Sequence, residues 1–153
     1  PSEYRKHITL DGKKTAEYDF SQLNPHIIYF AHHLEMGSDD AYDRVLDGEH
    51  RDIVKQAFNA MIQANGPLNQ KPRDINLDGL EMDWRDLRQR ILDAHKPIHH
   101  LFFSGIGNRL QFEDSCIAES VMLWFQKMDA PALPVHDSFI MHHAYGGELE
   151  EAM

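Results

Sequence analysis

The stretch "ALPVHDSFIM", residues 132–141, places a histidine and an aspartate in the middle of an apolar, strand-like run. Burying a carboxylate is costly unless it is paired or binds a metal ion. We therefore expect Asp137 to have a functional partner rather than a purely structural role. The pattern leaves open whether "LPVHD" and "SFIMHH" form two strands or one bent strand.

A second strand pair is expected near the beginning of the chain. The runs "HITL" (7–10), "DGKK" (11–14) and "TAEYDF" (15–20) predict a strand, a turn and a strand, because Asp-Gly between β-formers is typical of a hairpin. Side chains alternate along a strand, so Glu17 and Asp19 should share one face. Asp19 and Asp137 are both expected at or near strand ends.

The middle of the chain shows helical spacing of its apolar residues. The expected helices are one with Asn24 as N-cap and Pro25 at its first position, carrying Ile27, Phe30, Ala31 and Leu34; a short one at 39–46; one at 49–64 with Ile53, Ala57, Ala60, Met61 and Ala64 in a stripe; one at 82–95 capped by Asp83; one at 108–128 with Leu110, Cys116, Ile117, Val121 and Phe125; and a last one from 146. The sequence therefore predicts an α+β fold, with a small antiparallel sheet backed by helices.

Composition excludes several classes of protein. The chain has 153 residues, enough for one domain with a core, and its net charge of −10 argues against a simple DNA-binding module. Its one cysteine, Cys116, is expected in the core, and a disulfide within the chain is excluded, so a reducing cytoplasm is the expected compartment. No apolar run approaches the length of a membrane span, so no membrane partner is expected.

Two aspartates and two cations together suggest phosphoryl chemistry. Asp19 and Asp137 on adjacent strands could hold two divalent ions about 4 Å apart. Arg51 and Lys55 are four residues apart, hence on one helix face, and could bind a triphosphate.

The same residues lie in motifs that resemble a known family. "EYDFSQLNPHIIYFAHHL" (17–34) resembles the first catalytic motif of family A DNA polymerases, and "RDIVKQAFNA" (51–60) is similar to the second. "VHDSF" (135–139) resembles the third motif, which phage-type single-subunit RNA polymerases share, and "LQFEDSCIAESVM" (110–122) resembles the helix before it. The motifs follow one another in the order found in the family.

The resemblance implies a palm-like domain over residues 1–153, with a truncated fingers helix in an inserted helical segment at about 38–105, as a fragment of a longer polymerase whose thumb lies upstream. It implies a template-directed nucleotidyltransferase that adds nucleotides to a 3′-hydroxyl by a two-metal mechanism, in phage or plasmid DNA replication. The implied partners are nucleoside triphosphates, a primer–template nucleic acid and further segments or subunits.

The resemblance also implies roles for single residues. They are Asp19, Asp137 and the Phe20 carbonyl for two Mg²⁺ or Mn²⁺ ions; Arg51 and Lys55 for the triphosphate, with Lys55 as proton donor to pyrophosphate; Asn24 and Asn59 for the nucleotide; and Gln111 and His136 for primer and template. Asn24 stands where the DNA enzymes have the Glu that excludes a ribose 2′-hydroxyl, and Ser138 where they have another Glu. Gln63 and Asn59 replace a Tyr and an aromatic or Met. DNA and RNA products both stay open.

Two other functions are consistent with the sequence. A metal-dependent phosphohydrolase of the His-Asp type would need His136 and Asp137 on a helix, with His32 or His99 as a further ligand. A catalytically inactive palm-like scaffold would bind a partner without turnover. Arg51 and Lys55 could also be a solvated helix face paired with Asp47 and Glu49.

Overall fold

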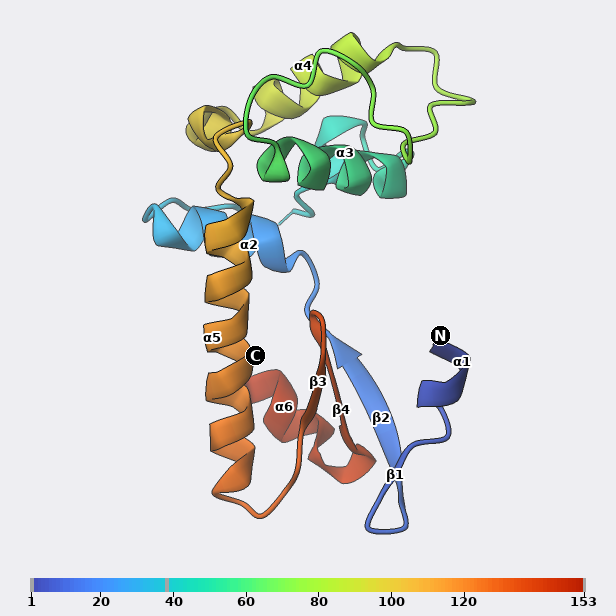
Figure 1. Ribbon diagram of the computed structural model, residues 1–153, viewed down its shortest axis with the longest axis vertical. Helices are drawn as coiled ribbons and strands as arrows, with labels where there is room; N and C mark the ends of the chain where they lie inside the picture. The colour runs from blue at the N-terminus through green and yellow to red at the C-terminus, as the bar shows by residue number, and fades with distance from the viewer. Residues whose placement is uncertain (1, 38, 153) are drawn as a thin grey trace. The chain divides into compact units, whose positions relative to one another are not determined.

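The computed structural model describes residues 2–37 and 39–152 of the chain (Figure 1). The chain divides into two compact units, which we describe separately: unit 1 is Pro1–Leu23 with Phe112–Met153, and unit 2 is Asn24–Gln111. Unit 2 contains the whole 38–105 segment that the resemblance treats as an insertion, and extends beyond it at both ends.

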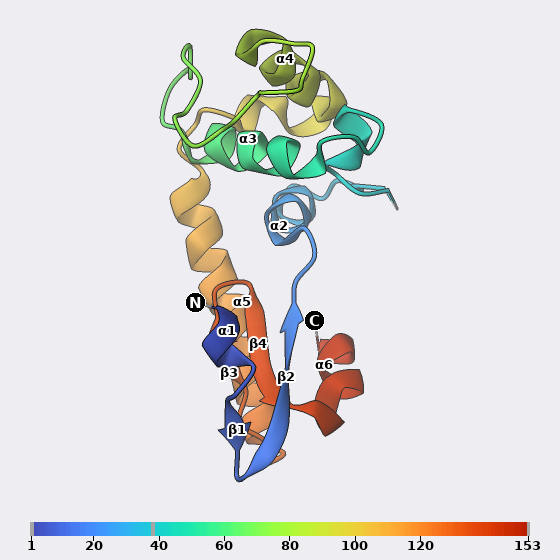
Figure 2. The same cartoon turned by 90° about the vertical axis from the view of Figure 1, so that its right-hand side faces the viewer.

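Unit 1 holds the sheet. Its elements are α1 (Ser2–Arg5), β1 (Thr9–Leu10), β2 (Lys13–Asp19), most of α5 (Gly107–Gln126), β3 (Leu133–Val135), β4 (Ser138–His142), the 3₁₀ helix η3 (His143–Tyr145) and α6 (Gly146–Ala152). The strand order is β1-β2-β4-β3 and every pairing is antiparallel. Figure 2 shows β1 folded back along the first residues of β2. The predicted α+β class and the predicted hairpin are therefore confirmed, while α1 was not expected.

The question left open by "LPVHDSFIM" is settled in favour of two strands. β3 ends at Val135, β4 begins at Ser138, and His136 and Asp137 form the turn between them. β4 then pairs with β2 from Asp19↔Ser138 to Thr15↔His142. The two ends of the chain thus form one sheet.

The core of unit 1 lies between this sheet and the helices α5 and α6 (Figure 1). Its buried residues are Val121 and Phe125 of α5, Phe139 and Met141 of β4, Leu149 of α6, and Ala130 in the loop between α5 and β3. Tyr18 packs against this cluster, whereas Glu17 and Asp19 are exposed, as strand alternation predicts. Cys116 on α5 is partly buried and makes no disulfide.

Unit 2 is helical. Its elements are α2 (Leu23–Ala31, which begins at the boundary), the 3₁₀ helix η1 (Asp43–Val45), α3 (Arg51–Gln63), α4 (Trp84–Ala94), the 3₁₀ helix η2 (Lys96–Leu101) and the start of α5. The α4 prediction is confirmed with its cap, since the Asp83 side chain accepts a hydrogen bond from the Asp86 N–H at 2.9 Å. Among the described residues, no helix is long and apolar enough to cross a bilayer.

The expected start of α2 was wrong, and its expected apolar face was only partly right, since Ile27 is buried as predicted. Gln22 has a left-handed φ of 58° and the helix begins directly after it, so Asn24 lies inside the first turn instead of capping it. Phe30 is 85% exposed and Leu34 lies beyond the helix end, while Ile28 is fully buried. The buried face is therefore rotated from the predicted one.

Two further helix predictions need correction. In place of a helix at 39–46 there is only the short η1, because the Asp40 carboxylate accepts hydrogen bonds from the N–H groups of Tyr42 and Asp43 and forms a turn. The apolar stripe of α3 is also shifted. Its buried residues are Val54, Ala57, Phe58, Met61 and Ile62, whereas Ile53 and Ala60 are partly exposed.

We expect Phe125→Ala to lower the free energy of unfolding of unit 1 by about 3–5 kcal/mol, because Phe125 is fully buried in its core. Leu123→Ala on the same helix, at a side chain that is 51% exposed, should change it by no more than about 0.5 kcal/mol. Urea denaturation in a Trp84→Phe background, followed by Trp124 fluorescence, measures both. Equal losses would contradict this assignment of the core.

Candidate functional site

The carboxylates Asp19 and Asp137 arise at the same end of the sheet. Asp19 is paired with Ser138, and the Phe20 N–H donates a hydrogen bond to the Asp137 carbonyl at 2.8 Å. This bond makes Asp19 and Ser138 a non-hydrogen-bonded pair, in which Cα atoms are about 4.5 Å apart. Asp137 precedes Ser138 directly, so the Cα atoms of the two aspartates lie within about 8 Å of each other.

The turn that carries Asp137 has an unusual backbone. His136 has a φ of 55°, in the left-handed region that non-glycine residues seldom adopt. Two-residue hairpin loops require such a conformation, since their twist must match that of the strands. The β3–β4 turn is therefore locally strained at His136, and His136 and Asp137 lie at the tip of the hairpin.

The two carboxylates have different surroundings. Asp19 shares its face with its partner Ser138, whereas the negative charge of Asp137 is felt on α5, where it contributes to a raised pKa of Asp114. Burial is the larger cause of that raised pKa, and His136 opposes it.

A polar network beside Asp19 was not predicted from the sequence. The Glu17 Oε1 atom accepts hydrogen bonds from the Ser138 hydroxyl at 2.8 Å and from Arg5 at 2.6 Å. The pKa of Glu17 is lowered, mainly by the hydrogen bond from Ser138. Desolvation acts in the opposite direction, and Arg5 lowers the pKa further. The available signal was that Glu17 and Asp19 share a face; the residue across from them could not be read from the sequence.

The donor set at this end of the sheet suits a magnesium ion. Within residues 2–37 and 39–152, no three His, Cys, Asp or Glu side chains are grouped as a ready-made metal site. Mg²⁺, however, is commonly held by one or two carboxylates, with water and substrate phosphates as the remaining ligands. Asp19, Asp137 and the backbone carbonyl of Phe20 are oxygen donors of this kind.

In unit 2, the predicted nucleotide-binding residues lie along one face of α3. Arg51, Lys55 and Asn59 recur every four residues and are all partly exposed, along the edge of the buried stripe. The side-chain amide of Asn24 donates a hydrogen bond to the Asn59 Oδ1 atom at 3.0 Å. Four of the predicted residues thus lie on α2 and α3, and two of them, Asn24 and Asn59, are in contact.

Arg51 already has partners, though not the predicted ones. Its guanidinium donates to Asp40 Oδ2 at 2.7 and 3.1 Å, lies 3.7 Å from Asp43 Oδ1 and stacks over the Tyr42 ring, instead of pairing with Asp47 and Glu49. Burial opposes ionisation of Asp40, but the hydrogen bonds from Arg51 and from the loop N–H groups outweigh it and lower the Asp40 pKa. Arg51 therefore fixes the loop before α3.

Lys55 is differently placed. No ion pair or hydrogen bond of its side chain is found in the described part of the chain. It lies one turn into α3, a helix that begins without a side-chain cap after His50. Unpaired N–H groups and the helix dipole make such a terminus favourable for anions. Of the two predicted cations, Lys55 is the one available to a phosphate.

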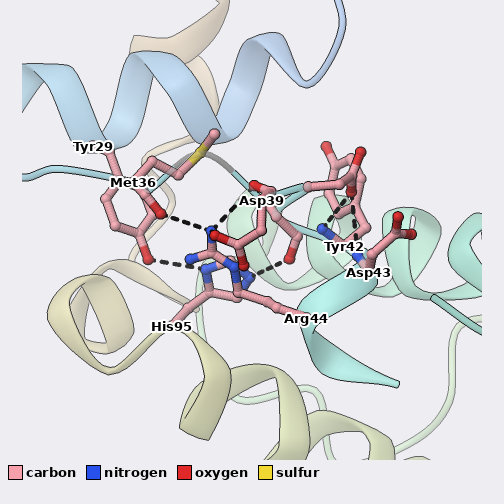
Figure 3. Close-up of polar contacts among 9 residues, drawn as sticks. Tyr29, Met36, Asp39, Tyr42, Asp43, Arg44 and His95 are labelled. Atoms are coloured by element: carbon pink, nitrogen blue, oxygen red, sulfur yellow. Dashed lines mark hydrogen bonds and ion pairs between the residues drawn. The ribbon is translucent and has the colours of Figure 1, made fainter. Parts of the chain in front are cut away.

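A buried histidine organises the interior of unit 2 (Figure 3). His95 is fully buried; its Nδ1 atom is 3.1 Å from the Tyr29 hydroxyl and its Nε2 atom is 3.0 Å from the Ala41 carbonyl. Because a carbonyl can only accept, Nε2 carries the proton and Nδ1 accepts from Tyr29. Burial is the main reason why the pKa of His95 is lowered to about 4, with the charge of Arg44 adding to it against the Ala41 bond.

The remaining predicted residues fall in different units. Gln111 is an exposed residue of α5 in unit 2, and His136 belongs to the hairpin tip of unit 1. His136 and Asp137 form a turn and not the helix that a His-Asp phosphohydrolase needs, while His32 and His99 belong to unit 2. The arrangement required by that alternative is therefore not the one observed.

Comparisons of the chain with protein-family models, with curated proteins and with solved structures found no match. The activity implied by the motifs therefore stays a prediction.

Asp137→Asn should lower the pKa of Asp114, because it removes the negative charge that helps to raise it. The part of the shift caused by burial should remain. Carboxyl carbon NMR during a pH titration measures this, with Asp11→Asn, in the β1–β2 turn, as the control. An unchanged Asp114 titration in Asp137→Asn would show that the two carboxyls do not interact.

Unit 2 should lose stability in acid because of His95. Unfolded, this histidine takes up a proton near its ordinary pKa of 6.5, but folded only near 4, so the unfolded chain binds more protons between these values. Above pH 6.5 His95 is neutral in both states and does not lower the free energy of unfolding. As the pH falls to 4, the free energy of unfolding decreases by about 3 kcal/mol.

His95→Gln should remove this part of the pH dependence. The measurement is urea denaturation from pH 7 to 4 in a Trp124→Phe background, where Trp84 fluorescence follows unit 2. Parallel pH profiles for the two proteins would contradict the assigned role of His95.

Proposed function

We propose that this chain is the palm-like part of a nucleotidyltransferase, which adds nucleotides to the 3′-hydroxyl of a primer. The observation that supports it most is the antiparallel pairing of β2 with β4, which brings Asp19 and Asp137 from the two ends of the chain to one end of the sheet. Two aspartates at neighbouring strand ends are the kind of donor set that two-metal phosphoryl transfer uses.

In this proposal Asp19, Asp137 and the Phe20 carbonyl hold divalent ions. When bound, two Mg²⁺ or Mn²⁺ ions would neutralise phosphate charge and lower the pKa of the attacking hydroxyl. Both aspartates bind the ions as carboxylates in this proposal.

Unit 2 binds the nucleotide in this proposal. Lys55 contacts the triphosphate and donates a proton to the departing pyrophosphate, since it is a cation without a partner among the described residues. The Asn24–Asn59 pair offers neutral hydrogen-bonding groups to sugar or base. Because Asn24 has an amide and not a carboxylate, it would not exclude a ribose 2′-hydroxyl. We therefore propose that ribo- and deoxyribonucleotides both bind. Gln111 and His136 contact the primer–template.

The proposal is tested by isothermal titration calorimetry of the whole chain with Mn²⁺, and then with Mn²⁺ and ATP. Asp19→Asn and Asp137→Asn should each weaken Mn²⁺ binding by at least about tenfold, because each removes a charged ligand. Lys55→Ala should weaken ATP binding about tenfold and leave Mn²⁺ binding unchanged, since one charge-assisted contact is lost. Asp11→Asn and Lys96→Ala are the matched controls.

Absence of Mn²⁺-dependent ATP binding by the unsubstituted protein would refute the proposal and favour an inactive scaffold. So would Asp19→Asn and Asp137→Asn proteins that bind Mn²⁺ as well as Asp11→Asn does. Primer extension with deoxy- and ribonucleotides then identifies the product.

A further inference from the structure

Ser138 occupies the position between the two proposed metal-binding aspartates. It follows Asp137 in the chain, it is the strand partner of Asp19, and it is only 5% exposed. A hydroxyl so buried needs a hydrogen-bond partner. Its Oγ atom has two, Glu17 Oε1 at 2.8 Å and the Val135 carbonyl at 2.9 Å.

The hydroxyl has one proton, so it donates to one of these oxygens at a time. An ionised carboxylate is the stronger acceptor, which favours the bond to Glu17. The Val135 carbonyl belongs to the last residue of β3, directly before the turn. Through its bond to Glu17, Ser138 therefore connects the first residue of β4 with β2.

Glu17 is itself held by a second donor. Arg5 at the end of α1 donates to the same Oε1 atom at 2.6 Å, and this ion pair is about one-third exposed at both side chains. The Glu17 carboxylate is therefore fixed by two donors from separate elements. Its orientation decides where the Ser138 hydroxyl bonds, and so how β4 begins.

We propose that Ser138 and Glu17 are positioning residues, which set the distance and direction between Asp19 and Asp137 for metal binding; this inference rests on the proposed function. Neither residue needs to touch the metal. Glu17 stands two residues before Asp19 on β2, and Ser138 one residue after Asp137. Their bond ties the two aspartate-bearing segments together directly beside the ligands.

Thr15 offers a matched control on the same strand face. Its hydroxyl donates to the Ile8 carbonyl at 2.7 Å, a hydrogen bond comparable to that of Ser138, but it is four residues from Asp19 at the other end of β2. Loss of either bond should cost similar stability, on the order of 1 kcal/mol. Only loss of the Ser138 bond should alter metal binding.

The test measures Mn²⁺ affinity by calorimetry and the exchange rate of the Phe20 amide by NMR. Ser138→Ala should weaken Mn²⁺ binding about 10–100-fold, as is typical for residues that orient metal ligands. It should also speed exchange of the Phe20 N–H, which is bonded to the Asp137 carbonyl. Ser138→Thr, which keeps the hydroxyl, and Thr15→Val should bind Mn²⁺ within about twofold of the unsubstituted protein.

Glu17→Ala removes the bond to Ser138 together with the Arg5 ion pair, so it should weaken Mn²⁺ binding at least as much as Ser138→Ala does. Because both substitutions remove the Ser138–Glu17 bond, the double variant should bind Mn²⁺ about as well as Glu17→Ala alone. If Ser138→Ala and Glu17→Ala bind Mn²⁺ like Thr15→Val while Asp137→Asn does not, the positioning role is refuted and the proposed function stands. If the unsubstituted protein binds no Mn²⁺, both fail.

Discussion

The pairing of β2 with β4 is the constraint on which the rest of unit 1 depends. It joins residues more than a hundred positions apart, and without it neither strand has a partner long enough to be stable. One face of the pair, with Tyr18 and Phe139, packs on α5 and α6. The other face keeps Glu17, Asp19 and Ser138 together. A shift of register by one residue would exchange the two faces, so the core itself fixes where the carboxylates lie.

In unit 2, some polar side chains hold the fold together, whereas others have no partner among the described residues. His95 and Arg51 are both fully engaged: the first joins Tyr29 to the Ala41 carbonyl, and the second holds the Asp40 turn. Lys55, one turn after Arg51 on the same helix, is not engaged in the described part of the chain. A motif that assigns both cations to one ligand therefore treats as equivalent two side chains that the fold uses differently.

Local chemistry made much of the fold predictable. The Asp11-Gly12 turn, the Asp83 cap and the long α5 each follow from neighbouring residues, and the structure has all three. The failures involve distant partners. The buried face of α2 depends on packing within unit 2, and Arg51 bonds to Asp40, not to the nearer Asp47 and Glu49. Glu17 likewise meets Ser138 through a sheet pairing whose register only the fold defines. The strand end at Asp19 could be predicted because the apolar pattern ends there, whereas the turn at His136–Asp137 was left open because apolar residues flank it on both sides.

The order of the elements has a consequence for biosynthesis. Unit 2 is one continuous segment, whereas unit 1 is made from both ends of the chain. A ribosome therefore releases all of unit 2 before β4 exists, and β2 must wait without its main partner while the helices ahead of it can already fold. Throughout that interval β2 has an unpaired edge, and the charged Lys13, Lys14 and Glu17 along it are of the kind that hinders association with other nascent chains.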